Sequence, residues 1–100
     1  MTSPADNQAA AEELVRCRDE IASIDRDIIS LLRKRVDIGL RTGVLKREMG
    51  LPILDPTREA AVIRTVVEAA RAESLPDEPI REIFWRILGL SRAAQQQEQK

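Results

Sequence analysis

Two polar residues interrupt the apolar pattern in the first half of the chain, and they are the first candidates for chemistry. Between residues 14 and 45 apolar side chains recur every three or four positions, and this spacing predicts apolar residues at 35 and 42. The sequence has Arg35 and Thr42 there. An arginine in an apolar helix seam is costly unless it meets a negative partner, so Arg35 indicates an anionic ligand. Alternatively, Arg35 sets the register of the paired helices, or its aliphatic stem packs in the seam while its guanidinium reaches water.

Two further cations could reach the same ligand. Lys46 follows Arg35 by three helical turns, so both side chains project from one side of a helix about 16 Å apart. Arg18 lies about 25 Å from Arg35 along the same helix, too far to share a small ligand. If two copies of the helix cross antiparallel near residues 28 and 29, however, Arg18 of the partner subunit falls between Arg35 and Lys46. The spacing therefore predicts pockets that draw cations from both chains of a dimer.

Polar residues in the second half of the chain could complete such a pocket. Asp55, Arg58 and Glu59 cluster within one helical turn, although Asp55 could be an ordinary N-cap and its two neighbours solvated. Further on, an apolar stripe ends on Ser91 and Gln95, which lie four residues apart on one helix face. They either direct a hydroxyl and an amide toward the cations, or they lie where the apolar stripe simply ends near the frayed C-terminus of the helix. Together these groups suit a small dianion that carries a hydroxyl.

The composition limits the reaction that this pocket could perform. The 100 residues include no histidine, so the commonest general base and metal ligand is missing. The polar set also offers no obvious nucleophile. We therefore expect no metal and no cofactor, and a reaction that needs only conformational restraint and charge stabilisation. A pericyclic rearrangement meets that description.

An all-α fold of three helices, one long and two shorter, is predicted to position these residues. The first helix should run from about Ala9 to Glu48, about 40 residues and on the order of 60 Å long. Its apolar seam follows a heptad made of Leu14, Cys17, Ile21, Ile24, Ile28, Leu31, Ile38 and Leu45.

The two shorter helices are predicted from caps and prolines. Asp55 and Pro56 provide an N-cap and a first residue for a second helix that reaches about Glu73. Its apolar side comprises Val62, Ile63, Val66, Val67 and Ala70. A proline at position 76 ends this helix, and Asp77 is the expected N-cap of the third. The apolar stripe of the third helix comprises Ile80, Ile83, Phe84, Ile87 and Leu88.

A chain this short predicts one domain, over residues 9–97, between a disordered tail at 1–8 and a C-terminal tail at 98–100. The first helix is too long for a compact monomer of this size, so much of its seam would stay uncovered. An exposed seam usually marks a partner surface, and the simplest partner is a second copy across a two-fold axis. We therefore predict an obligate, intertwined helical homodimer.

Charge and hydropathy exclude several other classes of partner. Sixteen basic residues balance seventeen acidic ones, which argues against a nucleic-acid platform. The polar, acidic N-terminus does not resemble a secretory signal or a transit peptide, and no apolar run approaches the roughly 18 residues of a membrane span. The single Cys17 cannot form an internal disulfide. We expect a cytoplasmic protein with neither nucleic-acid nor membrane partners.

With these positions in order, the chain resembles the all-helical, AroQ-type chorismate mutases, which convert chorismate to prephenate by a Claisen rearrangement in Phe and Tyr biosynthesis. The resemblance covers about residues 12 to 97. No one segment is specific, but eight polar positions recur in the family's order across three helices. The segments are RDEI at 18–21, ID at 24–25, LLRKR at 31–35, Lys46, PILDPTRE at 52–59 and SRAAQ at 91–95.

The resemblance implies a role for each matched residue. Arg35 and the partner subunit's Arg18 would bind the two carboxylates of chorismate, with Ser91 assisting. Lys46 and Gln95 would donate hydrogen bonds to the ether oxygen, where negative charge grows as the C–O bond breaks.

The remaining three positions would hold the other end of the substrate. The resemblance implies that Glu59, with the backbone at Asp55, binds the ring hydroxyl, and that Arg58 supports the carboxylate end. It also implies an intertwined dimer of three-helix chains, in agreement with the argument from the exposed seam.

Other functions on this scaffold stay open. An isochorismate-pyruvate lyase or a 4-amino-4-deoxychorismate mutase would bind its dianion with the same arginines, although Glu59 and its neighbours match the hydroxyl pattern. A non-catalytic helical dimer that binds a ligand or a protein would be marked by loss of Lys46 or Gln95, and both are present. Some short members of the family are activated by a partner synthase, so a regulatory partner enzyme is also left open.

Overall fold

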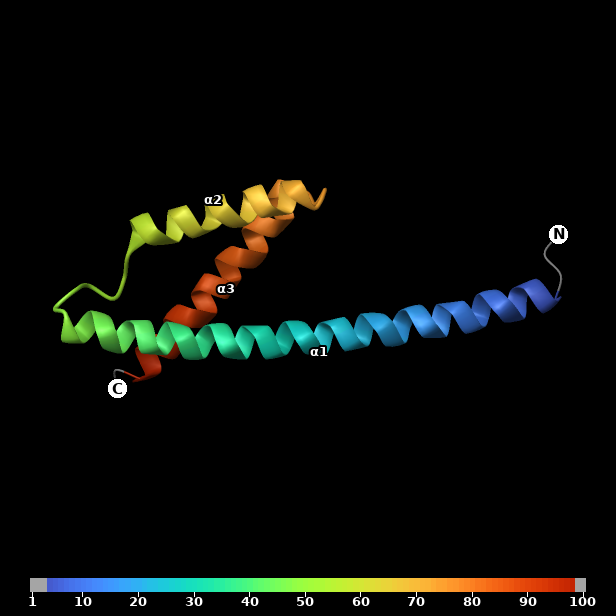
Figure 1. Cartoon of the computed structure of the whole chain (residues 1–100), viewed down its shortest axis with the longest axis horizontal. Helices are drawn as coiled ribbons and strands as arrows, with labels where there is room; N and C mark the ends of the chain where they lie inside the picture. The colour runs from blue at the N-terminus through green and yellow to red at the C-terminus, as the bar shows by residue number, and fades with distance from the viewer. Residues whose placement is uncertain (1–3, 99–100) are drawn as a thin grey trace. The chain divides into compact units, whose positions relative to one another are not determined.

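The protein is described by a computed structural model over residues 4–98, which form three α-helices and the segments between them (Figure 1). The helices are α1 (Pro4–Glu48), α2 (Pro56–Ala72) and α3 (Asp77–Glu98). No strand occurs in this part of the chain, so the predicted all-α class with one long and two shorter helices is confirmed.

The ends of the helical region differ from the predicted tails. Helix α1 begins at Pro4, not near Ala9, so residues 4–8 of the expected N-terminal tail are helical. Proline is well suited to a helix start because its missing N–H would have no intrahelical partner there, and the alanines that follow have high helix propensity. Helix α3 extends to Glu98. Residues 1–3 and 99–100 of the two predicted tails lie outside the described residues.

The chain divides into two compact units, residues 1–33 and residues 34–100. The described part of the first unit is the N-terminal portion of α1, and its predicted heptad seam is exposed. Five large apolar side chains of the seam are 48–62% exposed: Leu14, Ile21, Ile24, Ile28 and Leu31. Cys17, which belongs to the same seam, is exposed as well. This single chain therefore leaves an apolar stripe in contact with water along the first unit.

The second unit contains the last turns of α1 together with α2 and α3. Helix α2 packs against α3, and α3 returns from the end of α2 toward the last turns of α1 (Figure 1). The buried apolar side chains of the described residues belong to this unit: Val36, Val67, Ala70 and Leu88. Their burial fixes three helical segments around the region that holds the candidate site.

The boundaries of α2 follow the predicted signals. The Asp55 side chain accepts a hydrogen bond from the backbone N–H of Arg58 at 3.0 Å, and Pro56 occupies the first turn, so the predicted N-cap is confirmed. At the other end Ser74 adopts a φ of 58°, and the N–H of Leu75 donates to the carbonyl of Ala70 at 2.8 Å. This left-handed residue reverses the chain before α3 begins.

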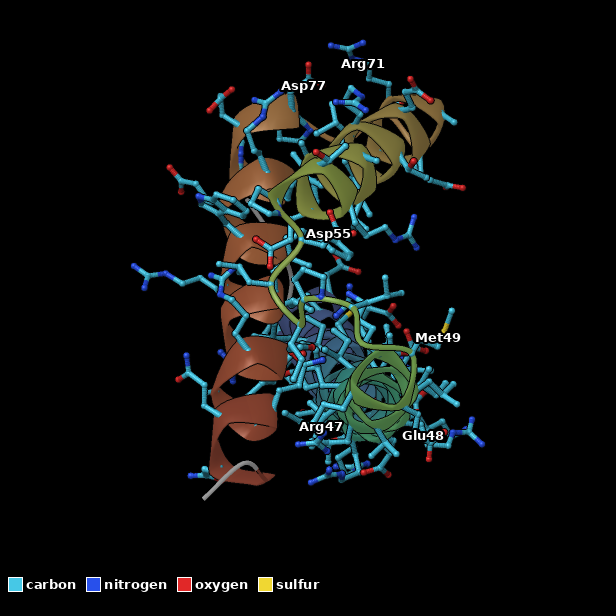
Figure 2. The ribbon with its side chains drawn as sticks, turned by 90° about the vertical axis from the view of Figure 1, so that its left-hand side faces the viewer. Arg47, Glu48, Met49, Asp55, Arg71 and Asp77 are labelled. Carbon is cyan, nitrogen blue, oxygen red and sulfur yellow. The ribbon has the colours of Figure 1, made fainter. Side chains whose placement is uncertain are left out.

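An ion pair closes the turn between α2 and α3. Two guanidinium nitrogens of Arg71 donate to the carboxylate of Asp77, the shorter contact being 2.6 Å. The hydrogen bond from Arg71 lowers the pKa of Asp77 below its usual value. Figure 2 shows this pair at the opposite end of the α2–α3 pair from Asp55. It stabilises the turn and lies away from the candidate site.

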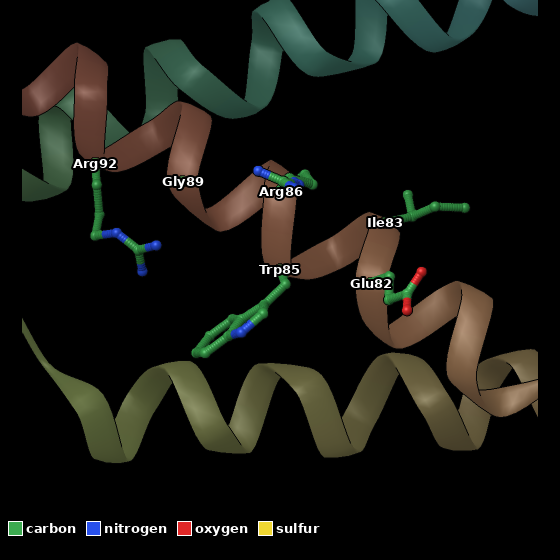
Figure 3. A pocket seen from close by; sticks show the side chains of 6 residues that line it. All are labelled: Glu82, Ile83, Trp85, Arg86, Gly89 and Arg92. Carbon is green, nitrogen blue, oxygen red and sulfur yellow. The ribbon is translucent and has the colours of Figure 1, made fainter.

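One residue of the predicted α3 stripe is placed differently. Leu88 is buried and Ile80, Phe84 and Ile87 are half-buried, but Ile83 is 52% exposed. Ile83 lies at the edge of the stripe, where it lines an open groove along α3 together with Glu82, Trp85, Arg86, Gly89 and Arg92 (Figure 3). The apolar face that packs inside the second unit is therefore narrower than the sequence pattern predicts.

Candidate active site

A cavity of about 160 Å³ in the second unit brings together seven of the eight predicted site residues. They come from the last turns of α1, the start of α2 and the last turns of α3. The seven are Arg35, Lys46, Asp55, Arg58, Glu59, Ser91 and Gln95. The eighth, Arg18, belongs to the first unit, where its side chain is exposed.

Arg35 is oriented by a hydroxyl group and not by a carboxylate. Its Nη1 donates a hydrogen bond to Ser91 Oγ at 3.0 Å, which links α1 to α3. Within residues 4–98, no ion pair joins Arg35 or Lys46 to an acidic side chain. A half-buried arginine held by a neutral partner keeps its charge for an anion that enters the cavity.

The two other long polar side chains are held by backbone carbonyls. Lys46 Nζ donates to the carbonyl of Ile53 at 3.2 Å, and Gln95 Nε2 donates to the carbonyl of Gly39 at 2.9 Å. An ammonium group has three N–H donors and an amide has two, so each side chain has further donors for a ligand. Both donors are thus fixed in place by groups that carry no charge.

Close packing of α3 on α1 depends on a glycine beside Gln95. Gly43 is buried, and a Cβ built there would lie 3.7 Å from both Cγ and Nε2 of Gln95. A methyl group would just fit, but any larger side chain would displace the amide. The absence of a side chain at Gly43 therefore helps to set the position of Gln95.

The first turn of α2 contributes the acidic side of the cavity. The Asp55 carboxylate is engaged as the N-cap, and its carbonyl accepts a hydrogen bond from the N–H of Glu59 at 3.0 Å. The side chain of Glu59 lines the cavity and is 17% exposed. Arg58 also lines the cavity but is an exposed residue. Asp55 thus acts mainly through the backbone that it fixes.

Two polar residues that line the cavity were not assigned a role from the sequence. Arg92 donates from Nη1 to Glu59 Oε1 at 2.6 Å, an ion pair between α3 and α2. Its position next to Ser91 and three residues before Gln95 places it at the edge of the same helix face, which was the available signal. Thr42, which breaks the heptad, also lines the cavity, while its hydroxyl donates to the carbonyl of Ile38 in its own helix at 3.0 Å.

The wall of the cavity combines excess positive charge with apolar surface. Four cationic side chains face it against two carboxylates. Its apolar part is formed by Ile53, Val62 and Leu88. This combination suits a small anion whose carbon skeleton packs against the apolar wall while its charged groups meet the cations.

Similarity to known proteins identifies the family of the chain. The sequence pattern of the family Chorismate mutase type II matches residues 17–96. A chorismate mutase of Methanocaldococcus jannaschii is 26% identical over 86 residues, which are 86% of this chain and 87% of that protein. A 4-amino-4-deoxychorismate mutase of Streptomyces venezuelae is 34% identical over 50 residues, which are 50% of this chain and 48% of that protein.

Other relatives are much longer than this chain. The T-protein of Enterobacter agglomerans is 34% identical over 76 residues, which are 76% of this chain but 20% of that protein, so the chain spans about a fifth of its length. No solved structure shows a significant match to the chain. Because the family pattern covers most of the sequence, including all eight of the predicted site positions, the chain belongs to the chorismate mutase type II family.

Proposed function

We propose that the protein is a chorismate mutase that rearranges chorismate to prephenate for aromatic amino acid biosynthesis. The observation that carries the proposal is the cavity in which Arg35 and Lys46 lie beside Ser91, Gln95 and Glu59 and, among residues 4–98, form no ion pair with a carboxylate. The reaction breaks the ether C–O bond and forms a C–C bond within one molecule, and it requires neither an acid nor a base. A cavity without a histidine is adequate for it.

Binding of the two substrate carboxylates is assigned to arginines. Arg35 is already directed by Ser91 and offers further N–H donors in a planar fork that fits a carboxylate. We assign the other carboxylate to Arg18 of the partner subunit. Holding both carboxylates would bring the flexible enolpyruvyl arm over the ring, in the chair-like geometry that the rearrangement needs.

Stabilisation of the transition state is assigned to Lys46 and Gln95. As the C–O bond breaks, negative charge grows on the ether oxygen, and two donors aimed at that oxygen lower the barrier. Both side chains are held by backbone carbonyls before the substrate arrives, so they need little reorganisation. Loss of one such donor costs about 3 kcal/mol, a rate loss of a hundredfold or more.

The ring hydroxyl is assigned to Glu59 at the start of α2. Its carboxylate lines the cavity, and the cap at Asp55 fixes the turn from which it projects. The exposed Arg58 supports the neighbouring carboxylate end. A hydroxyl that donates to Glu59 would orient the ring with respect to the two ether-oxygen donors.

The proposed assembly is an intertwined homodimer. The exposed apolar seam of the first unit supports it, because a second copy would bury these side chains. None of the helices within residues 4–98 is long and apolar enough to cross a membrane. We place the protein in the cytoplasm, where the single thiol of Cys17 would stay reduced.

The direct test is to mix the purified protein with chorismate and follow the loss of its ultraviolet absorbance. Prephenate, detected as phenylpyruvate after acid treatment, is the expected product. The same protein is then offered isochorismate, from which a lyase would release salicylate and pyruvate. Failure to convert chorismate, or faster release of pyruvate from isochorismate, would refute the proposed activity.

A further inference from the structure

Arg92 is the residue of the cavity whose charge the proposed mechanism does not use. Its Nη1 lies 2.6 Å from Glu59 Oε1, and the two side chains are 36% and 17% exposed. A carboxylate with so little access to water depends on this guanidinium for compensation of its charge. The pair spans α3 and α2, so it also fixes the direction in which Glu59 enters the cavity.

A tryptophan also lies beside the guanidinium of Arg92. Trp85 precedes Arg92 by two helical turns, and both side chains leave α3 on the side that faces α2 (Figure 3). The guanidinium carbon lies 5.7 Å from the centroid of the Trp85 ring, within the range of a cation–π interaction. Gly89 lies between them on the helix, and a Cβ there would already touch Nη2 of Arg92 at 3.7 Å. The guanidinium therefore interacts with both an aromatic ring and a carboxylate.

This arrangement determines what Glu59 can recognise. One carboxylate oxygen already accepts from Arg92, and the remaining lone pairs can accept a hydrogen bond from a neutral hydroxyl. An amine at the same ring position carries a positive charge at neutral pH, and it would have to bind close to the guanidinium of Arg92. Like charges placed together at a binding site disfavour the wrong ligand.

We propose that Arg92 is a positioning and specificity-determining residue, which orients and neutralises Glu59 so that the site accepts a ring hydroxyl and rejects a ring amine. The proposal rests on the function proposed above for Glu59. Trp85 has a supporting role in this proposal, because its ring restricts where the guanidinium of Arg92 can lie. Chorismate and 4-amino-4-deoxychorismate differ at this one ring position, so they are the two substrates that Arg92 would separate.

The test compares kcat/KM for chorismate and for 4-amino-4-deoxychorismate in the full-length protein and its variants. Arg92→Gln should shift the ratio of the two values roughly tenfold toward the amino substrate, because it removes the positive charge that repels the charged amine. Arg92→Lys keeps the charge on which the discrimination depends, so its ratio should stay within about twofold of the parent value. Arg86→Gln removes another arginine from the same groove and should leave the ratio unchanged.

A purely structural role for Arg92 predicts a different result. Arg92→Gln would then lower kcat/KM for both substrates by the same factor, and the ratio would stay at the parent value, which overturns the proposal. Circular dichroism and sedimentation measurements establish that each variant folds and assembles like the parent. If Arg92→Gln does not fold, Arg92→Met retains the apolar stem and removes the same charge, so the ratio can be measured on it.

Two further measurements separate this inference from the proposed function. Absence of mutase activity in the parent protein overturns both. If the parent is active but Glu59→Gln leaves both kcat/KM values unchanged, the assignment of Glu59 is wrong and the inference falls with it. If Glu59→Gln lowers the activity on chorismate while Arg92→Gln leaves the substrate ratio unchanged, the inference alone is overturned.

Discussion

We expect the parent activity to be independent of pH near neutrality, and replacement of Gln95 by glutamate should restrict that activity to acid. In the parent, the Gln95 amide donates to the carbonyl of Gly39 at 2.9 Å and has a second N–H, which we assign to the ether oxygen. An amide donates at every pH. An ionised glutamate has no donor, and its oxygen would face the Gly39 carbonyl at a distance where two acceptors repel each other.

The magnitude follows from the fraction of the variant that carries a proton. A glutamic acid with an ordinary pKa of about 4.3 is protonated in roughly one molecule in 500 at pH 7 and one in six at pH 5. We therefore expect kcat of Gln95→Glu to be at least about a hundredfold below the parent at pH 7, consistent with loss of one oxyanion donor. It should rise about tenfold for each pH unit between 7 and 5.

The assay is the initial rate of chorismate loss between pH 5 and pH 8, with three matched proteins beside the variant. The parent should show a flat profile near neutrality, and Gln95→Ala should be slow at every pH. Gln97→Glu places the same charge on an exposed position of the same helix and should behave like the parent. A Gln95→Glu rate equal to the parent at pH 7, or a reduced rate that does not change with pH, would refute the assigned role of Gln95.

The other predictions concern the shared site, its packing and the turn. Chains with Arg18→Ala and chains with Arg35→Ala should each be inactive. Refolding them together should restore about a quarter of the parent activity, because half of the dimers would be mixed and each mixed dimer would have one intact site of two. No recovery in assembled heterodimers would exclude a site built from both chains. Gly43→Leu should lower kcat at least tenfold by displacing the amide beside it, whereas Gly43→Ala should be nearly neutral, as steady-state kinetics will show. Arg71 lowers the folded-state pKa of Asp77, so the pair stabilises the fold above about pH 4 and this contribution is lost as the pH falls through the lower pKa. The melting temperature of Asp77→Asn should therefore fall below that of the parent near neutrality and approach it in acid, and a constant difference across this range would contradict the assignment.

The features that the sequence predicted correctly depend on neighbouring residues. The start of α2 is an example, because Asp55 and Pro56 form a cap with groups only three residues away. The helix class and the exposed seam follow in the same way from the spacing of apolar residues along one helix. Such local signals do not depend on how the three helices pack.

The features that the sequence did not predict depend on distant residues. The partner of Arg92 is Glu59, 33 positions away, and their contact exists only because α3 packs against α2. Ile83 belongs to the apolar pattern of α3, yet the width of the packed face leaves it exposed. The role of Arg18 depends on a second chain, whose position the spacing of residues along one helix does not determine.

Some polar side chains of the cavity are held by neutral groups and one cation is held by a carboxylate, and this difference matches the charge of the substrate group proposed to bind beside each of them. Arg35, Lys46 and Gln95 are oriented by a hydroxyl or a backbone carbonyl, neutral groups that fix each donor and leave the charge of the two cations uncompensated. These donors are the ones assigned to a carboxylate and to the ether oxygen, where negative charge is present or develops. Among the cations that line the cavity in the described chain, Arg92 is the one paired with a carboxylate, and it lies where the substrate would present a neutral hydroxyl. Anchoring by neutral groups thus keeps positive charge where the reaction needs it, while the ion pair neutralises Glu59, whose unpaired negative charge would favour a ring amine over the hydroxyl.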